Sequence, residues 1–388
     1  MQMKTLFICV TAVVAMMLCG CTAVEKKNNG GTAGASVPAD SAAVVVPRYA
    51  KGFSVKCLEN GVRLVDVADP QKSGKKAKTY HFALVPRGIK ADVPEGYTGV
   101  AVPIRSAICM TSLQLSNFTA LGAHDFVSGL TGTKNLYNAD ILKRVRDGRI
   151  VKIGTEGNFD AEVVMAANPD VIFISPFKRG GYDAVKETGV TLVPHLGYKE
   201  LDPLGQAEWI KFIAMFIGRE AEANTVFDGI ARRYAEVKAI AAGAKHRPTV
   251  FSGEMHGGNW YAVGGRSYLA QIFRDAGADY ILRDDDNTGG IPIEFEKMYA
   301  LAAEADYWRI LNSFPGDFSY EALRSSEPRN ADFKAFRERR VIYCNMRRTP
   351  YYEITPVQPD VVLKDLVAVF HPELMPKDYK PTFYRLLR

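Results

Sequence analysis

The sequence predicts an α/β protein made of two similar halves joined by one long helix, with a small N-terminal β appendage. From about residue 100 onward, strand-like apolar runs alternate with helical stretches, which favours mainly parallel sheets with right-handed crossovers. Residues 220–242 form one uninterrupted helical pattern, and a fresh β-α series begins after it at Pro248. Residues 53–85 instead alternate apolar and polar side chains, as strands do.

A short apolar N-terminus predicts export. Lys4 supplies a positive charge, and residues 6–18 form an apolar run that is too short to span a bilayer but typical of a signal peptide. Residues 18–21 read LCGC and resemble a bacterial lipobox. We therefore expect residues 1–21 to be a lipoprotein signal peptide and the protein to lie in the cell envelope, on the periplasmic face or the cell surface, lipid-anchored through Cys21. The alternative is an ordinary signal peptide that is cut nearby.

Two segments follow before the main body. Residues 22–47 are rich in Ala, Gly, Asn, Ser and Val and are expected to be a flexible tether. Residues 48–97 are expected to form a small β extension, in which Asn60-Gly61 is typical of a hairpin turn. The strand-like runs of this extension are 53–58, 62–67 and 79–85. Alternatively, these strands form a solvated face of the main body.

Composition excludes several classes of protein. The net charge of +6 is mild and spread along the chain without a basic block, so we expect no nucleic-acid partner. No second apolar run approaches the roughly 18 residues of a membrane span. Cys57, Cys109 and Cys344 lack metal-ligand spacing. Cys109 and Cys344 lie in strand-like apolar runs, so we expect them to be buried free thiols, although the sequence leaves a disulfide open.

The two lobes are expected at residues 98–218 and 246–388, with a connecting helix at 219–245. An apolar stripe at 209–217 predicts a helix that ends at Gly218. At 1.5 Å per residue the uninterrupted helical pattern at 220–242 would extend about 35 Å, close to the diameter of a small domain. The strands are expected at 101–110, 170–175, 190–196, 249–255, 306–311 and 340–346. A single larger sheet with two crossover helices here is the alternative.

Short segments from about residue 100 to the C-terminus carry a family resemblance. They are 106–112 with 120–123, 159–162 with 167–172, 204–211, 264–268 with 275–278, and 357–360 with 371–373. Their order and spacing resemble the ABC-transporter substrate-binding proteins that handle iron–siderophores, haem and cobalamin. The resemblance implies two Rossmann-like lobes joined by a single long backbone helix. Asn168 departs from the lysine usual in this family, and the extension at 48–97 is additional.

The resemblance also implies a function. It implies a lipoprotein that captures an iron chelate, either a ferric siderophore or haem, between its lobes and delivers it to an ABC permease with its ATPase. A corrinoid is an alternative cargo. We expect a monomer that reaches the membrane through its lipid anchor and carries no cofactor. The family docks on its permease through one acidic residue on each lobe, and Glu162 and Glu296 occupy the matching positions.

No catalytic signature stands out. The sequence lacks GxSxG, P-loop and HExxH motifs and a well-placed GxGxxG, and its six histidines are scattered. We therefore expect a binding protein rather than an enzyme. A chelate-processing enzyme on the same scaffold and a purely structural surface lipoprotein are the alternatives from other classes.

Aromatic and basic residues follow the predicted strands at their carboxyl ends, where open α/β sheets bind ligands. A planar, anionic cargo would suit this set, because rings can stack on it and guanidinium groups can grip its carboxylates or catecholates. The expected ligand-binding residues are Phe177, Lys178, Arg179, Tyr198, Met255, His256, Trp260, Tyr261, Phe314, Arg347, Arg348, Tyr351 and Tyr352. If the cargo is haem, His256 or Tyr198 could be its axial ligand. The spacing predicts no site for a bare metal ion.

Overall fold

The computed structural model describes residues 44–72, 78–134, 136–155, 157–176 and 182–388. The predicted signal peptide with Cys21, most of the tether, and the predicted ligand residues Phe177, Lys178 and Arg179 lie outside the described residues. The fold below is that of the compact unit Ala42–Arg388.

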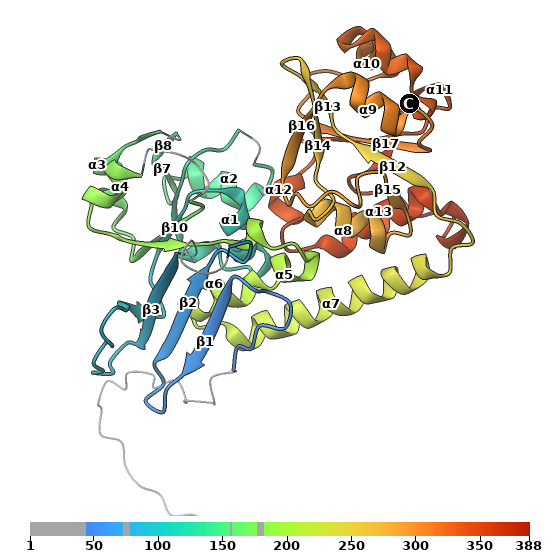
Figure 1. Cartoon of the computed structure of the whole chain (residues 1–388). Coiled ribbons are helices and arrows are strands. Elements are labelled where there is room, and N and C mark those ends of the chain that lie inside the picture. The colour runs from blue at the N-terminus through green and yellow to red at the C-terminus, as the bar shows by residue number, and fades with distance from the viewer. Residues whose placement is uncertain (1–43, 73–77, 135, 156, 177–181) are drawn as a thin grey trace, which may run out of the picture. The chain divides into compact units, whose positions relative to one another are not determined.

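The N-terminal extension is a four-stranded sheet in the order β1-β2-β3-β4 (Figure 1). Its strands are β1 (Phe53–Cys57), β2 (Arg63–Ala68), β3 (Thr79–Pro86) and β4 (Thr98–Val102). The hairpin predicted at Asn60-Gly61 is confirmed, because Cys57 pairs with Arg63 across an antiparallel ladder. The last strand, β4, runs parallel to β3. The expected single strand at 101–110 is wrong, because β4 ends where Pro103 lacks the N–H that a ladder needs.

The first lobe contains a fully parallel sheet in the order β11-β10-β5-β6-β7. Its strands are β5 (Ala107–Cys109), β6 (Val127–Leu130), β7 (Val151–Lys152), β10 (Val171–Ile174) and β11 (Thr191–Pro194), beside the small hairpin β8 (Gly154–Thr155) and β9 (Asn158–Phe159). Its helices are α1 (Ser112–Ala120), η2 (His124–Phe126), α2 (Ala139–Arg146), α3 (Ala161–Ala167), α4 (Asp183–Glu187), η3 (Gly197–Lys199), α5 (Pro203–Ala207) and α6 (Trp209–Ile217). The alternation of strands and helices predicted this parallel arrangement.

The second lobe also contains a mainly parallel sheet, in the order β15-β12-β17-β18-β19. Among the described strands of this sheet, only the edge strand β19 runs antiparallel to its neighbour. An antiparallel sheet, β13-β14-β16, accompanies it. The strands are β12 (Thr249–Ser252), β13 (Glu254–His256), β14 (Asn259–Val263), β15 (Asp279–Tyr280), β16 (Gly290–Ile293), β17 (Tyr307–Asn312), β18 (Val341–Asn345) and β19 (Arg385–Leu386). The helices are α8 (Tyr268–Asp275), α9 (Phe295–Ala302), α10 (Tyr320–Ser326), η4 (Pro328–Asp332), α11 (Lys334–Arg337), α12 (Tyr351–Ile354), α13 (Pro359–Phe370) and η5 (Pro372–Leu374).

The strand expected at 249–255 is divided at Gly253. This glycine has a φ of +107°, and a Cβ there would lie 1.9 Å from the carbonyl oxygen of Tyr261. Only glycine permits such a close approach with this backbone conformation. The chain therefore leaves β12 and turns into the β13–β14 hairpin, which carries several of the expected ligand residues.

The long connecting helix is present as α7 (Glu220–Ala242), which Figure 1 shows running from the first lobe to the second. Gly218 takes the left-handed conformation at the end of α6, with a φ of +70°, and thereby separates α6 from α7. The buried face of α7 packs on α6 of the first lobe and on α13 of the second. The fold therefore has two α/β lobes on one helical backbone, as the sequence predicts.

Two buried carboxylates fasten the extension to the first lobe. Glu208 Oε2 accepts hydrogen bonds from the backbone N–H groups of Arg48, Tyr49 and Ala50 at 2.8, 2.7 and 3.0 Å. Glu200 Oε1 accepts the N–H groups of residues 51 and 52 at 2.9 and 2.8 Å. Because each carboxyl oxygen satisfies backbone donors that would otherwise lack a partner, the start of the extension is held in one geometry.

Segments that follow strands of the two lobes contact each other. Glu353 of α12 accepts hydrogen bonds from the backbone N–H groups of Tyr137 and Asn138, the latter at 3.0 Å. The Tyr137 hydroxyl donates to the carbonyl of Met346 at 3.1 Å. The extension also bridges the lobes, because Gln71 Nε2 donates to the carbonyl of Lys199 at 2.7 Å while its Oε1 accepts from the Thr288 hydroxyl at 2.7 Å.

The described cysteines are free thiols, with Cys109 and Cys344 buried as expected and Cys57 exposed. None of the helices in the described part of the chain is long and apolar enough to cross a membrane.

Candidate functional site

A cavity of about 480 Å³ opens at the carboxyl ends of β12 and β17 in the second lobe. This is the edge of a parallel sheet at which α/β proteins bind ligands. The cavity brings together three residues that the sequence predicts for ligand binding, Met255, His256 and Tyr261. It also contains two charged residues that the sequence reading missed, Glu254 and Arg309.

Arg309 supplies the positive charge of this cavity. It lies within β17, is 8% exposed, and donates from Nε to the Tyr384 hydroxyl at 3.0 Å. Burial opposes its charge, but the oxygens of Tyr384 and Tyr351 hold the pKa of Arg309 above its ordinary value. Among the described residues, no carboxylate lies within ion-pair distance of the guanidinium. A buried cation of this kind is costly, and an anionic group bound in the cavity would offset that cost.

Glu254 shares the cavity with Arg309. Its Oε1 accepts a hydrogen bond from Asn312 Nδ2 at 3.0 Å. Burial raises the pKa of Glu254 above its ordinary value, although the Asn312 bond and the attraction of Arg309 work in the opposite direction. The carboxyl therefore shifts toward its neutral form, in which it does not repel an anion.

The β13–β14 hairpin presents its aromatic residues on opposite sides. Tyr261 is 48% exposed, and its ring contacts that of His256 with centroids 6.1 Å apart. The neighbouring Trp260 is wholly buried, and its Nε1 donates to the carbonyl of Ser252 at 3.0 Å. Placing Trp260 among the ligand-contacting residues was therefore wrong, because alternate residues of a strand point to opposite faces.

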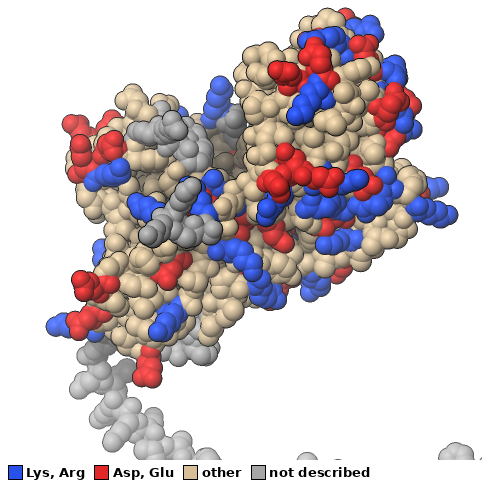
Figure 2. Space-filling view, in the orientation of Figure 1, with Lys and Arg blue, Asp and Glu red and all other residues tan. Residues whose placement is uncertain are grey.

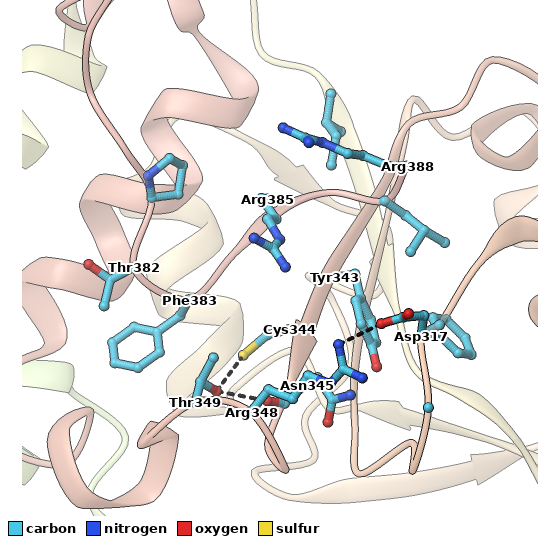
Figure 3. Close-up of a pocket in the computed structure, with 15 residues that line it drawn as sticks. Asp317, Tyr343, Cys344, Asn345, Arg348, Thr349, Thr382, Phe383, Arg385 and Arg388 are labelled. Atoms are coloured by element: carbon cyan, nitrogen blue, oxygen red, sulfur yellow. Dashed lines mark hydrogen bonds and ion pairs between the residues drawn. The ribbon is translucent and has the colours of Figure 1, made fainter. Parts of the chain in front are cut away.

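A second cavity, of about 400 Å³, lies beside β18 and β19 (Figure 3). Arg348, Arg385 and Arg388 line it, and Arg348 forms an ion pair with Asp317 at 2.5 Å. Both partners of that pair are largely exposed, so the interaction contributes little stability. Burial raises the pKa of the Cys344 thiol in its wall to about 11, which keeps the thiol unreactive near neutral pH.

The remaining residues expected after β17 and β18 have different roles. Arg347 is exposed and Tyr352 is 50% exposed, so both side chains are accessible to solvent. Tyr351 is buried, and its hydroxyl accepts a hydrogen bond from Tyr384 at 2.9 Å. Phe314 packs its ring on Phe318 with centroids 5.2 Å apart. Tyr351 thus supports the network of Arg309 through the Tyr384 hydroxyl.

In the first lobe, Tyr198 lies on η3 at the carboxyl end of β11 and lines a separate cavity of about 280 Å³. Burial raises the pKa of its hydroxyl well above the ordinary value. Within the residues that the structure describes, no group of three or more His, Cys, Asp or Glu side chains could hold a metal ion. His256 and Tyr198 line different cavities.

The two predicted docking residues begin helices on different lobes. Glu162 is exposed in the first turn of α3, which Asp160 caps by accepting the N–H groups of residues 162 and 163. Glu296 occupies the first turn of α9 and pairs with Arg329 at 2.8 Å. Arg329 also stacks over the Phe295 ring at 3.9 Å. Both glutamates are exposed, with 76% of the Glu296 side chain accessible.

Charge on the surface is mixed. Figure 2 shows Lys and Arg side chains interspersed with Asp and Glu over the face in view. Attraction of an anion would act at short range, since salt screens exposed charges beyond about 8–10 Å.

The fold and its cavities define a two-lobed α/β binding protein. Residues 108–347 match the profile of the family described as periplasmic binding protein, and the chain belongs to this family. Its members are substrate-binding proteins of transport systems rather than enzymes, as the sequence predicts.

Relatives and solved structures agree with this assignment. An uncharacterized lipoprotein of Methanocaldococcus jannaschii is 29% identical over 304 residues, which cover 74% of this chain and 70% of that protein. A periplasmic heme binding protein from Pseudomonas aeruginosa shares the fold with a TM-score of 0.57 at 20% identity, over 74% of this chain and 98% of that one. An ABC-type Fe3+-hydroxamate transport protein from Saccharomonospora viridis has a TM-score of 0.54 at 17% identity, over 69% and 94%.

Proposed function

We propose that this protein captures an iron chelate, a ferric siderophore or haem, and delivers it to an ABC permease. The observation that carries the proposal is Arg309, a buried cation without a described carboxylate partner in a cavity of about 480 Å³ at the ligand edge of the second lobe. Solved proteins with this fold include a heme binder and a Fe3+-hydroxamate transport protein. Both kinds of cargo combine a bulky organic frame with oxygen-rich groups, which suits a cavity of mixed apolar and charged lining.

A panel of four chelates tests the proposal directly. Residues 22–388 are titrated with ferric protoporphyrin IX, a ferric trihydroxamate, a ferric triscatecholate and cyanocobalamin, and the melting temperature and intrinsic fluorescence are followed. A specific cargo present at 100 times its Kd should stabilise the fold by about 2.7 kcal/mol. A stabilising iron chelate supports the proposal. Stabilisation by cyanocobalamin alone would mean that the cargo is a corrinoid and not an iron chelate. The absence of any response would refute the proposal.

If haem is the cargo, we propose His256 or Tyr198 as its axial ligand. His256 is exposed at the tip of a hairpin that lines the second-lobe cavity. Tyr198 lies at the ligand edge of the first lobe. Histidine and tyrosine ligation give distinct absorbance spectra, so the haem titration of the panel also identifies the ligand.

The affinity for an anionic cargo should rise as the pH falls through the pKa of Glu254. Burial raises that pKa, so above it the carboxylate opposes the anion, and below it the neutral carboxyl leaves the charge of Arg309 unopposed. We expect about a tenfold change across the transition, the size of one partly screened charge pair. The Kd is measured from mildly acidic to neutral pH for the wild type and for Glu254→Gln, which should bind with the acid-side affinity throughout. Because protonation of the cargo is common to both proteins, identical pH profiles would contradict this role.

We propose that Glu162 and Glu296 dock the protein on its permease. Their exposure at matching helix starts on the two lobes supports this assignment. The double variant Glu162→Ala with Glu296→Ala should bind cargo normally and lose most uptake in cells that carry the cognate permease and ATPase. The control, Glu187→Ala with Glu321→Ala, removes exposed acidic residues from the same two lobes and should transport normally. Retained uptake in the first double variant would refute the docking assignment.

We further propose that Cys21 carries a lipid and holds the protein at the membrane. The LCGC sequence and the description of a relative as a lipoprotein support this proposal. The tether at 22–47 would then give the binding unit the reach to meet its permease.

A further inference from the structure

The N-terminal sheet and the first lobe together form the cavity of about 280 Å³ that contains Tyr198. Lys72, Lys78 and Tyr80 come from the extension, whereas Tyr198 and Lys199 come from η3. Because η3 directly follows β11, this cavity stands at the carboxyl edge of the first-lobe sheet, where ligands bind. The extension therefore walls part of the ligand edge of the first lobe.

The cavity has an excess of positive charge. Its three lysines face one carboxylate, that of Asp69, which lies 3.9 Å from Lys72 Nζ and 3.8 Å from Lys199 Nζ. The ammonium of Lys78 instead lies 4.6 Å from the centre of the Tyr80 ring, and no carboxylate among the described residues is within ion-pair distance of it. Lys199 likewise stands 5.6 Å from the Tyr198 ring centre. Positive groups thus alternate with aromatic faces around a small hollow.

Described residues on the two sides of the cavity are held to one another. The bridge of Gln71 to the Lys199 carbonyl and to Thr288 holds the rim of the extension against both lobes, with each bond at 2.7 Å. Glu200 and Glu208 fasten the start of the extension. A site whose walls are already in place binds with a smaller loss of conformational freedom.

We propose that this cavity is a subsite for a carboxylate carried on an aromatic or other planar group of the cargo. Lys78 and Lys199 would hold the carboxylate, and Tyr80 and Tyr198 would cover the attached ring. The inference rests on the proposed function and deepens it. It concerns the extension, which lies outside residues 108–347 that match the family. The extension thereby selects which chelates this chain accepts.

The subsite is tested first with benzoate, the smallest aromatic carboxylate, and with benzamide as its neutral counterpart. Saturation-transfer NMR should detect benzoate and not benzamide on the wild-type protein. Lys78→Gln with Lys199→Gln should weaken benzoate binding about tenfold, whereas Lys377→Gln with Lys380→Gln, at exposed lysines elsewhere, should leave it unchanged. The inference would be overturned if benzoate and benzamide bind equally well. It would also be overturned if Lys78→Gln with Lys199→Gln leaves the affinity for benzoate unchanged.

The second arm uses whichever carboxylate- or catecholate-bearing chelate of the four binds the wild type most tightly. Its affinity should also fall about tenfold in Lys78→Gln with Lys199→Gln. An unchanged chelate affinity in that variant would overturn the role in cargo selection while leaving the proposed function intact. If no chelate binds the wild type, the proposed function fails, and the benzoate arm still decides whether the anion subsite exists.

Discussion

Replacing Arg309 with methionine should weaken binding of an anionic chelate by about 10- to 100-fold. Charge-assisted hydrogen bonds contribute about 1.5–3 kcal/mol, and Arg309 is 8% exposed, so water screens its charge little. Arg309→Lys keeps the charge and should recover part of the affinity. Isothermal titration with the best chelate of the panel measures the loss.

Two control variants separate the charge from the surrounding fold. Tyr384→Phe removes the hydroxyl that accepts from Arg309 and keeps the cation, so it should lower the melting temperature more than the affinity. Arg347→Ala with Arg348→Ala removes two arginines that the sequence predicted for ligand binding, and we expect only a few-fold loss of affinity because both side chains are exposed. If folded Arg309→Met keeps its affinity, or if the double variant loses more affinity than Arg309→Met does, then Arg347 and Arg348 rather than Arg309 provide the main contact with the anion.

The fold was accessible from the sequence because its main signals are periodic. The apolar stripe of α7 continues without proline to Ala242, and it predicted one connecting helix at 219–245, where the structure has Glu220–Ala242. The errors arose where one residue interrupts an apolar run. Pro103 separates β4 from β5, and Gly253 turns the chain out of β12, yet both lie in segments whose composition predicts a continuous strand.

The candidate site was only partly accessible. The rule that ligands lie beyond the carboxyl ends of strands selected Met255, His256 and Tyr261, because it needs only the order of the elements. It missed Arg309, which lies inside β17 among apolar neighbours. An arginine within a central strand is itself a signal, since burying its charge is costly without a function or a partner. The lysines of the extension could not be predicted, because their contact with η3 depends on how two separate sheets pack.

Replacing Glu208 with alanine should lower the free energy of unfolding by about 3–5 kcal/mol, the loss expected when one partner of a buried ion pair is removed. Glu208 is wholly buried, pairs with Lys211 Nζ at 2.8 Å and accepts three backbone N–H groups from residues 48–50. The substitution leaves the Lys211 ammonium and these donors without their acceptor. Chemical denaturation measures the loss, and Glu208→Ala with Lys211→Met should recover part of it because no unpaired buried cation remains.

The same substitution should release the extension from the first lobe. We expect faster proteolysis ahead of Phe53 and, since the extension supplies Lys72 and Lys78, weaker benzoate binding in Glu208→Ala. Glu222→Ala is the matched control, because it also removes a carboxylate that pairs with a residue three positions away, but at the surface, where 41% of its side chain is accessible. That control should match the wild type in its free energy of unfolding, its resistance to protease and its affinity for benzoate. Equal stability of the Glu208 and Glu222 variants would mean that the extension is held by its apolar contacts with Trp209 and Phe212 rather than by the buried carboxylate.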